Sequence, residues 1–399
     1  MKFSLNQFLS GLSLALDCVE SELLGVRSHH GRRVAYLAMR LGKLADFSAQ
    51  ELFDIAAFSL LHDNGLAEES LTRQLHPEQR LRHIENDPQH CLIGEANIAA
   101  FPFQTEIRDV VRYHHEHWDG SGFFALRGEE IPLMAQMVGL ADYTDLVCCF
   151  SEAGSRERVH SFLASHKGTT FSPRLLEMFQ EVASSTAFWL DMQDPFIVRA
   201  LAAEMPEITI EQQWSEILRL SRVFSRIIDA KSRFTLRHSS GLEEKSAVMA
   251  DWFALPEDEK TMLRIAAALH DVGKLAIPST ILDKPGKLDE AERQKMAEHT
   301  YYTRRCLEGI PGFATITEWA ANHHEKLNGQ GYPYALTANA LPAQARLLTV
   351  LDIYQALTEE RPYRQPLPHS QVLEILTSMV ERGEIDGEMV AAVNRAFSS

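Results

Sequence analysis

The sequence predicts an all-α protein built from two similar helical bundles. Apolar residues recur at three- and four-residue spacing through most of the 399 residues, whereas the alternation typical of strands is scarce. A set of histidines and aspartates also occurs twice along the chain in the same order. The length suggests two or three domains at roughly 150 residues each, which agrees with a duplication.

The helices can be predicted in order from the apolar spacing. Residues 1–24 have this spacing with acidic residues among them, so we expect an amphipathic helix rather than a cleaved leader peptide. Glycine and proline gather at 278–288 and 328–333, which we expect to be loops. The same spacing predicts helices at 33–44, 50–61, 92–101, 130–150, 212–230, 243–254, 258–270, 289–308, 313–324, 342–358 and 370–382.

Seven residues of metal-binding type are present in each copy. The first copy has His30, His62, Asp63, His90, His114, His115 and Asp142. The second copy has His238, His270, Asp271, His299, His323, His324 and Asp352. Because the offset changes only from 208 (His30 to His238) to 210 (Asp142 to Asp352), a tandem duplication explains the pattern. We place the domains at 1–195 and 205–399, joined across the proline-containing stretch 191–210.

Charge and composition exclude several classes of function. Acidic residues outnumber basic ones by 55 to 39, giving a formal net charge of −16, which argues against a protein that coats DNA or an anionic membrane. No apolar run approaches the ~20 residues that cross a bilayer. We therefore expect a cytoplasmic protein with neither DNA nor membrane as partner.

The cysteine pattern favours reduced thiols. The chain has an odd number of cysteines, and none forms a CxxC pair. We therefore expect neither a disulfide framework nor a zinc site of the cysteine type. The five positions are Cys18, Cys91, Cys148, Cys149 and Cys306.

The histidine and aspartate set is suited to divalent first-row metals such as manganese, iron, zinc or nickel. The intervals are too long for one helix, so several helices would direct these side chains into one bundle core. Adjacent residues such as His270 and Asp271 point about 100° apart on a helix, so both reach one site only at a helix end or where two metals bind. Seven ligands with one bridging carboxylate fit two metals, a common arrangement for phosphoester hydrolysis. The alternative for the first copy is a set of residues kept for packing, or one that binds metal without turnover.

The second copy carries further motifs over about residues 230–365. They are His270-Asp271-Val272-Gly273-Lys274, Lys284-Pro285-Gly286-Lys287-Leu288, His323-His324-Glu325, Asn328-Gly329-Gln330-Gly331-Tyr332-Pro333 and Arg361-Pro362-Tyr363-Arg364. With these motifs the sequence resembles the HD-GYP family of cyclic-dinucleotide phosphodiesterases. The pairing of a degenerate HD half with a complete one is similar to bacterial phosphodiesterases that cleave 3′,3′-cyclic GMP-AMP (cGAMP).

The resemblance implies a role for each matching residue. His238, His270, Asp271 and Asp352 would bind one metal, and Asp271, His299, His323 and His324 the other, with Asp271 bridging. Asp271 and Lys274 would be catalytic, and Lys274, Arg361 and Arg364 would contact the substrate. The Gly331-Tyr332-Pro333 loop would form the rim of the site and a surface for a protein partner.

The resemblance also implies the reaction and the metals. Metal-bound hydroxide would attack one phosphodiester of cGAMP or cyclic di-GMP and release a linear 5′-phosphorylated dinucleotide. Phe234 stands where some members have a glutamate for a third metal, so we expect two, manganese or iron, with nickel or zinc as alternatives. Asn328 stands where the family has an aspartate.

The first copy departs from the family at the residues that would handle substrate. Leu66 stands in the place of Lys274, Phe123-Phe124 replaces the Tyr-Pro pair, and no RPYR motif follows Asp142. We expect this domain to be able to bind metal but to turn over substrate poorly, and to act in scaffolding, dimerisation or regulation. Two other functions stay open for the chain: a non-catalytic cyclic-dinucleotide receptor, and another HD nucleotide phosphohydrolase. The sequence leaves the metal, the choice between the two dinucleotides and the oligomeric state undecided.

Overall fold

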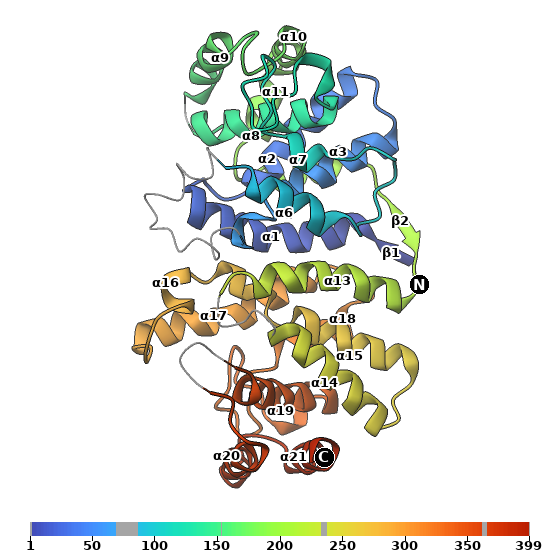
Figure 1. Cartoon of the computed structure of the whole chain (residues 1–399), viewed down its shortest axis with the longest axis vertical. Helices are drawn as coiled ribbons and strands as arrows, with labels where there is room; N and C mark the ends of the chain where they lie inside the picture. The colour runs from blue at the N-terminus through green and yellow to red at the C-terminus, as the bar shows by residue number, and fades with distance from the viewer. Residues whose placement is uncertain (1, 69–86, 153, 233–237, 361–364, 399) are drawn as a thin grey trace. The chain divides into compact units, whose positions relative to one another are not determined.

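The computed structural model describes residues 2–68, 87–152, 154–232, 238–360 and 365–398. The chain divides into two compact units: an N-terminal unit of residues 16–209, and a C-terminal unit of residues 1–15 and 210–399. Helices form nearly all of the described regular structure, so the all-α prediction is confirmed (Figure 1). In the described ranges the exception is one pair of short strands, β1 (Lys2–Ser4) and β2 (Thr209–Glu211), which the sequence did not predict.

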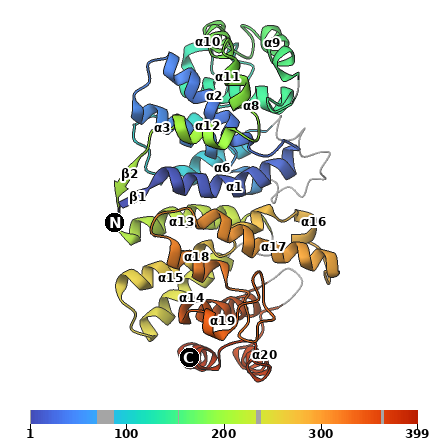
Figure 2. The same ribbon diagram turned by 180° about the vertical axis from the view of Figure 1, so that it is seen from behind.

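The N-terminal unit is built around α2 (His30–Leu44). This helix packs against α3 (Ala49–Leu61) and α8 (Leu133–Cys148), and α12 (Ile197–Glu204) also lies against it (Figure 2). Ser48 and Glu51 form a capping box that starts α3. The remaining elements are the second part of α1 (Leu5–Leu24), then α6 (Gln89–Ile98), α7 (Val110–Tyr113), η1 (Gly128–Glu130), α9 (Ser155–Ser165), α10 (Pro173–Ala183) and α11 (Thr186–Asp191).

The C-terminal unit repeats this plan around α14 (His238–Trp252). This helix packs against α15 (Glu257–Leu269) and α19 (Ala343–Thr358), while α20 (His369–Glu381) and α21 (Gly387–Phe397) lie side by side (Figure 1). The predicted loop at 278–288 contains one turn of helix, α16 (Ser279–Leu282). The other elements are α13 (Trp214–Asp229), η2 (Val272–Ala276), α17 (Glu290–Leu307), α18 (Ala314–Ala321) and η3 (Ala338–Ala340).

The first fifteen residues belong to the unit formed by the second half of the chain, which differs from the predicted boundary at 1–195. Phe3 and Phe8 are completely buried. The ring of Phe3 lies 6.0 Å from that of Phe313, and the ring of Phe8 lies 5.5 Å from that of Phe224. Apolar burial therefore assigns this segment to the C-terminal unit. The second boundary between the units lies at residues 209–210. Helix α12 precedes it and lies within the stretch 191–210 that the sequence predicted to join the domains.

Replacing Phe8 by alanine should destabilise the C-terminal unit. Removing a buried phenylalanine costs about 3–5 kcal/mol because the cavity left behind is only partly refilled. Denaturant unfolding of the full chain would measure the loss, with Phe8→Leu as the milder control. An unchanged unfolding midpoint in Phe8→Ala would mean that this segment adds nothing to the core.

None of the helices in the described part of the chain combines the length and the apolar character needed to cross a membrane.

Candidate metal centres

In the C-terminal unit, the ends of three helices and the bodies of two others bring the seven predicted residues together. His238 is the first residue of α14, and His270 and Asp271 lie between α15 and η2. His323 and His324 follow the end of α18. Both adjacent pairs therefore lie at helix ends, where neighbouring side chains can reach one site. The bodies of α17 and α19 supply His299 and Asp352.

Three of these histidines are held in one orientation by their own backbone. Nδ1 of His270 donates to the carbonyl of Ala267 at 2.7 Å, and His299 and His323 donate in the same way at 2.6 Å to the carbonyls three residues earlier. With Nδ1 protonated, each Nε2 atom presents a lone pair to the core. This is the tautomer of a histidine that ligates through Nε2.

The lone pairs face one another without a proton between them. Nε2 of His299 and Nε2 of His323 are 3.3 Å apart, and both are acceptors in this tautomer. Within the described residues, Nε2 of His270 is buried and has no hydrogen-bond partner. A buried acceptor without a partner is costly, so this arrangement fits a cation among the nitrogens.

The two oxygens of Asp271 face different histidines. Oδ1 lies 3.5 Å from Nε2 of His299 and 3.7 Å from Nε2 of His323, whereas Oδ2 lies 3.1 Å from Nε2 of His270. Asp352 lies on the other side, with Oδ1 2.9 Å from Nε2 of His238. The carboxylate of Asp271 thus faces two separate sets of histidines. In three groups the ligand atoms all lie within 4.8 Å of one another: His238, His270 and Asp352; His270, Asp271 and His323; and His299, His323 and His324.

Burial and nearby charge put His299, His324 and Asp271 in the protonation states that metal binding requires. Burial lowers the pKa of His299 to about 3 and that of His324 to about 4. Burial acts to raise the pKa of Asp271, but His270 and Lys274 hold it well below its usual range. Neutral imidazoles and an ionised carboxylate are the forms that ligate metal. Lys274 is beside them, with Nζ 2.5 Å from Oδ2 of Asp271.

Glu359 and Glu325 belong to the site although the sequence analysis gave them no role. Oε2 of Glu359 lies 3.3 Å from Nδ1 of His238 and therefore orients that ring. Glu325 accepts the backbone N–H groups of Tyr334 at 2.7 Å and Leu336 at 2.9 Å, which holds the loop at 331–333. The only sequence signal for Glu325 was its place directly after the histidine pair, and Glu359 had none.

The loop at 331–333 lies against the candidate metal ligands. The ring of Tyr332 is 5.1 Å from that of His324 and 6.3 Å from that of His299. Gly331 packs so closely on the backbone of Glu325 that a Cβ atom would overlap it. The predicted substrate contacts Arg361 and Arg364, and the position of Phe234, lie outside the described residues.

Glu359→Gln should weaken metal binding tenfold to a hundredfold, because it removes the charged partner that orients His238. The glutamine keeps the size of the side chain, so packing is preserved. Titration of metal-free protein against a competing chelator would measure the affinity. An affinity equal to that of the wild type would show that Glu359 does not support the ligand.

The N-terminal unit brings its seven residues together in the same way. His30 is the first residue of α2, and Nε2 lies 3.0 Å from Oδ1 of Asp142 in α8. Nδ1 of His62 lies 2.8 Å from the carbonyl of Ser59, and Nδ1 of His114 lies 2.6 Å from that of Val111. Two groups have all ligand atoms within 4.8 Å: His30, His62 and Asp142; and His90, Cys91, His114 and His115.

Three features distinguish this unit from the other. Leu66 occupies the position that Lys274 has in the other unit, so this unit has no lysine ammonium there. The leucine side chain is completely buried. Glu20 of α1 is almost completely buried, and burial raises its pKa to about 8. Cys91, to which the sequence analysis assigned no role, is one of the four residues of the second group. The sequence signal for Cys91 was its place next to His90.

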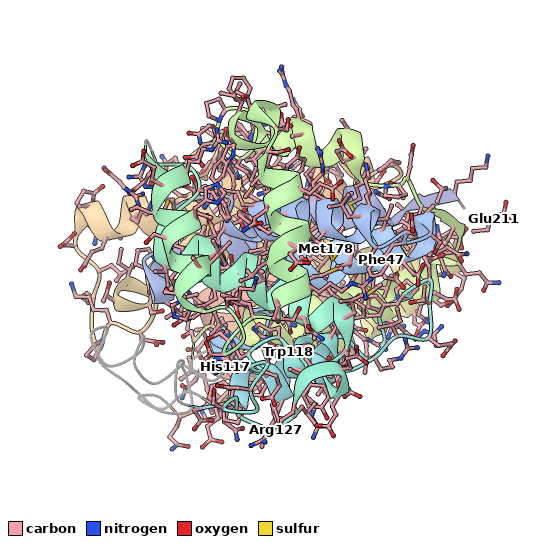
Figure 3. The ribbon with its side chains drawn as sticks, turned by 90° about the horizontal axis from the view of Figure 1, so that it is seen from above. Phe47, His117, Trp118, Arg127, Met178 and Glu211 are labelled. Atoms are coloured by element: carbon pink, nitrogen blue, oxygen red, sulfur yellow. The ribbon has the colours of Figure 1, made fainter. Side chains whose placement is uncertain are left out.

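A cavity of about 550 Å³ opens beside the N-terminal cluster. Asp63, His114, His115 and Asp142 form one part of its wall. Its other walls carry aromatic side chains, among them Trp118, Phe123, Tyr143 and Phe171. Figure 3 labels His117, Trp118 and Arg127, which belong to the segment that follows the histidine pair His114 and His115. A solute therefore has a path to the histidines of this unit.

A family model described as the HD domain matches residues 19–153 and 222–389, which together span most of the chain. The chain belongs to the HD domain family. The two matches fall on the two copies, so each unit is an HD domain. HD domains are metal-dependent, in agreement with the clusters in both units.

Relatives of known activity extend the comparison. The 3′3′-cGAMP-specific phosphodiesterase 1 of Vibrio cholerae serotype O1 is 29% identical, over 98% of this chain and 91% of that protein. The cyclic di-GMP phosphodiesterase response regulator RpfG of Xanthomonas campestris pv. campestris is 36% identical, over 41% of this chain and 43% of its own. A crystal structure of the cyclic GMP-AMP-specific phosphodiesterase V-cGAP3 of V. cholerae matches with a TM-score of 0.68 and 25% identity, over 100% of this chain and 98% of that one. The resemblance drawn from the motifs is therefore confirmed.

Proposed function

We propose that the chain is a metal-dependent phosphodiesterase that hydrolyses a bacterial cyclic dinucleotide to a linear 5′-phosphorylated product. The observation that carries the proposal is the position of Asp271, whose two oxygens face two separate sets of histidines. Such an arrangement would suit a two-metal site for phosphoester hydrolysis. The names of relatives that match over the whole chain support the substrate class.

The C-terminal unit is the catalytic unit in this proposal. His238, His270 and Asp352 would hold one ion, and His299, His323 and His324 the other, with Asp271 between them. Two divalent ions, manganese or iron with nickel or zinc as alternatives, would activate water and neutralise charge on the phosphoryl oxygens.

The protein's own residues would bind and orient the dinucleotide. Lys274 supplies an ammonium beside Asp271, where a phosphate oxygen of the substrate can accept a hydrogen bond. Arg361 and Arg364 would contact a phosphate or a base. Tyr332, whose ring lies near those of His299 and His324, would help to shield them from bulk water.

The mixed dinucleotide cGAMP is the substrate that we favour over cyclic di-GMP. The relatives named as cGAMP-specific include two that match 98% and 99% of this chain. The cyclic di-GMP phosphodiesterase RpfG matches 41% of it. The arrangement of two HD domains is thus shared with cGAMP-specific enzymes along the whole chain.

The N-terminal unit would bind metal but turn over substrate poorly. Its metal-binding residues are assembled, yet Leu66 leaves the phosphate without an ammonium. Its role would be scaffolding, dimerisation or regulation. A homodimer, a protein partner at residues 331–333 and a cytoplasmic location remain predictions.

The test is an assay of the purified full chain with Mn²⁺ or Fe²⁺ and both dinucleotides. Products would be identified by liquid chromatography and mass spectrometry, and bound metal would be measured on the same protein. We expect a linear dinucleotide, formed faster from cGAMP. If neither substrate is cleaved although two metals are bound, the enzyme proposal fails and the receptor takes its place.

A further inference from the structure

We propose that His90, Cys91, His114 and His115 form a closed, four-ligand site for zinc in the N-terminal unit. This inference rests on the proposal that the unit binds metal, and it names the ligand that sets the choice of ion. The four residues offer three imidazoles and one thiol, with all four ligand atoms within 4.8 Å of one another. Imidazole nitrogen and thiolate sulfur are both common ligands of tetrahedral zinc.

The position of the sulfur fits coordination of one ion with the imidazoles. Sγ of Cys91 lies 3.3 Å from Nε2 of His90. Zinc bonds of about 2.3 Å to sulfur and about 2.0–2.1 Å to nitrogen place two tetrahedral ligand atoms roughly 3.5 Å apart. The thiol and the ring of His90 thus already have the separation of two ligands on one ion.

His114 is oriented to act as a ligand. Its Nδ1 lies 2.6 Å from the carbonyl of Val111, so that nitrogen carries the proton. Its Nε2 is buried and has no hydrogen-bond partner among the described residues. A backbone carbonyl that fixes the tautomer is the usual outer partner of a ligating histidine. His114 and His115 also line the cavity, which gives an ion a path to the site.

The C-terminal unit shows what the cysteine changes. The position that matches Cys91 is Thr300, directly after His299, and its hydroxyl donates to the carbonyl of Ala297 at 3.0 Å. The corresponding group there has three ligands, His299, His323 and His324. A cysteine added to the three histidines takes a position that water or substrate could otherwise occupy. Cys91 therefore gives the N-terminal site one protein ligand more than its C-terminal counterpart.

The thiol of Cys91 also determines which metal ion the site prefers. Thiolate ligands favour zinc over manganese, which prefers oxygen ligands. Binding deprotonates Cys91, and the proton passes to solvent while the sulfur–zinc bond forms. We expect the two units of one chain to hold different metals, zinc in the first and the catalytic ions in the second.

Cobalt substitution tests the ligand directly. Metal-free full-length protein would be loaded with Co²⁺, because a thiolate ligand gives a charge-transfer band in the near ultraviolet. We expect the band in the wild type and in Cys149→Ser, a control in the same unit outside the cluster. Cys91→Thr, which installs the residue of the matching position, should lose the band and lower zinc affinity at least about tenfold. A band that persists in Cys91→Thr would overturn the proposal.

A second measurement uses the wild type alone, so it does not depend on the folding of a variant. X-ray absorption of the zinc-loaded protein should show a sulfur neighbour at about 2.3 Å. A zinc environment of nitrogen and oxygen alone would overturn cysteine ligation but leave metal binding by the N-terminal unit standing. Zinc lost completely from a His323→Ala variant, whose C-terminal site is disabled, would overturn both. Hydrolysis of cyclic dinucleotide, measured separately, tests the proposed function of the C-terminal unit independently.

Discussion

Asp271→Ala should abolish hydrolysis, with a fall in kcat/KM of more than about 10³-fold. Asp271 faces both groups of histidines, so the substitution would disturb both proposed metals at once. Two metal ions supply several kcal/mol of transition-state stabilisation, and each 1.4 kcal/mol is about tenfold in rate. The measurement is steady-state hydrolysis together with the metal content of the same preparation.

The duplication provides a matched control. Asp63 holds the equivalent position in the N-terminal unit, and its Oδ1 lies 4.0 Å from Nε2 of His90 and 3.9 Å from Nε2 of His114. Asp63→Ala removes the same chemical group from the other HD domain. Its hydrolysis rate should stay within a few fold of the wild type. Equal losses in the two variants would mean that both units contribute to catalysis.

Lys274→Leu should lower kcat by about 10²–10³-fold, the range seen when one preorganised donor to a developing anion is removed. Leucine is the residue that the N-terminal unit carries at this position, Leu66. The ammonium is close to the ligands, with Nζ 2.5 Å from Asp271, but it is not a metal-binding group. Metal content should therefore stay at the wild-type level while turnover falls.

Lys274→Arg separates charge from geometry. It keeps the positive charge on a larger planar group, so we expect partial recovery of the rate relative to leucine. A loss of metal in Lys274→Leu that matches the loss of rate would contradict a role in substrate binding. It would indicate instead that the lysine holds Asp271 in place.

The spacing of the histidines and aspartates predicted which residues come together in each candidate site, whereas it predicted less of the fold. The seven positions in each copy are brought together because a helical bundle directs residues on separate helices into one core. The predicted helices at 50–61 and 342–358 match α3 and α19 closely. Their apolar spacing is regular, and prolines or capping residues mark their starts.

Other features of the structure depend on contacts between residues far apart in the sequence, which no local sequence pattern indicates. The assignment of residues 1–15 to the C-terminal unit follows from the packing of Phe3 and Phe8 on rings more than two hundred residues away. Glu359 acts on His238 through the folding of the chain, and no motif marked it. Cys91 directly follows His90 in the sequence. The CxxC pattern did not identify it, because its neighbours in the cluster are histidines and not a second cysteine.

The burial of Phe3 and Phe8 makes the C-terminal unit a discontinuous domain, interrupted by the whole of the N-terminal one. During synthesis its first segment leaves the ribosome before its remaining partners exist, so the N-terminal unit can complete its core first. A fragment that starts at residue 205 would lack both rings and leave Phe224 and Phe313 partly uncovered. To obtain the C-terminal unit alone, the residues of the N-terminal unit should therefore be removed. The two flanking segments of the C-terminal unit would then be joined by a linker.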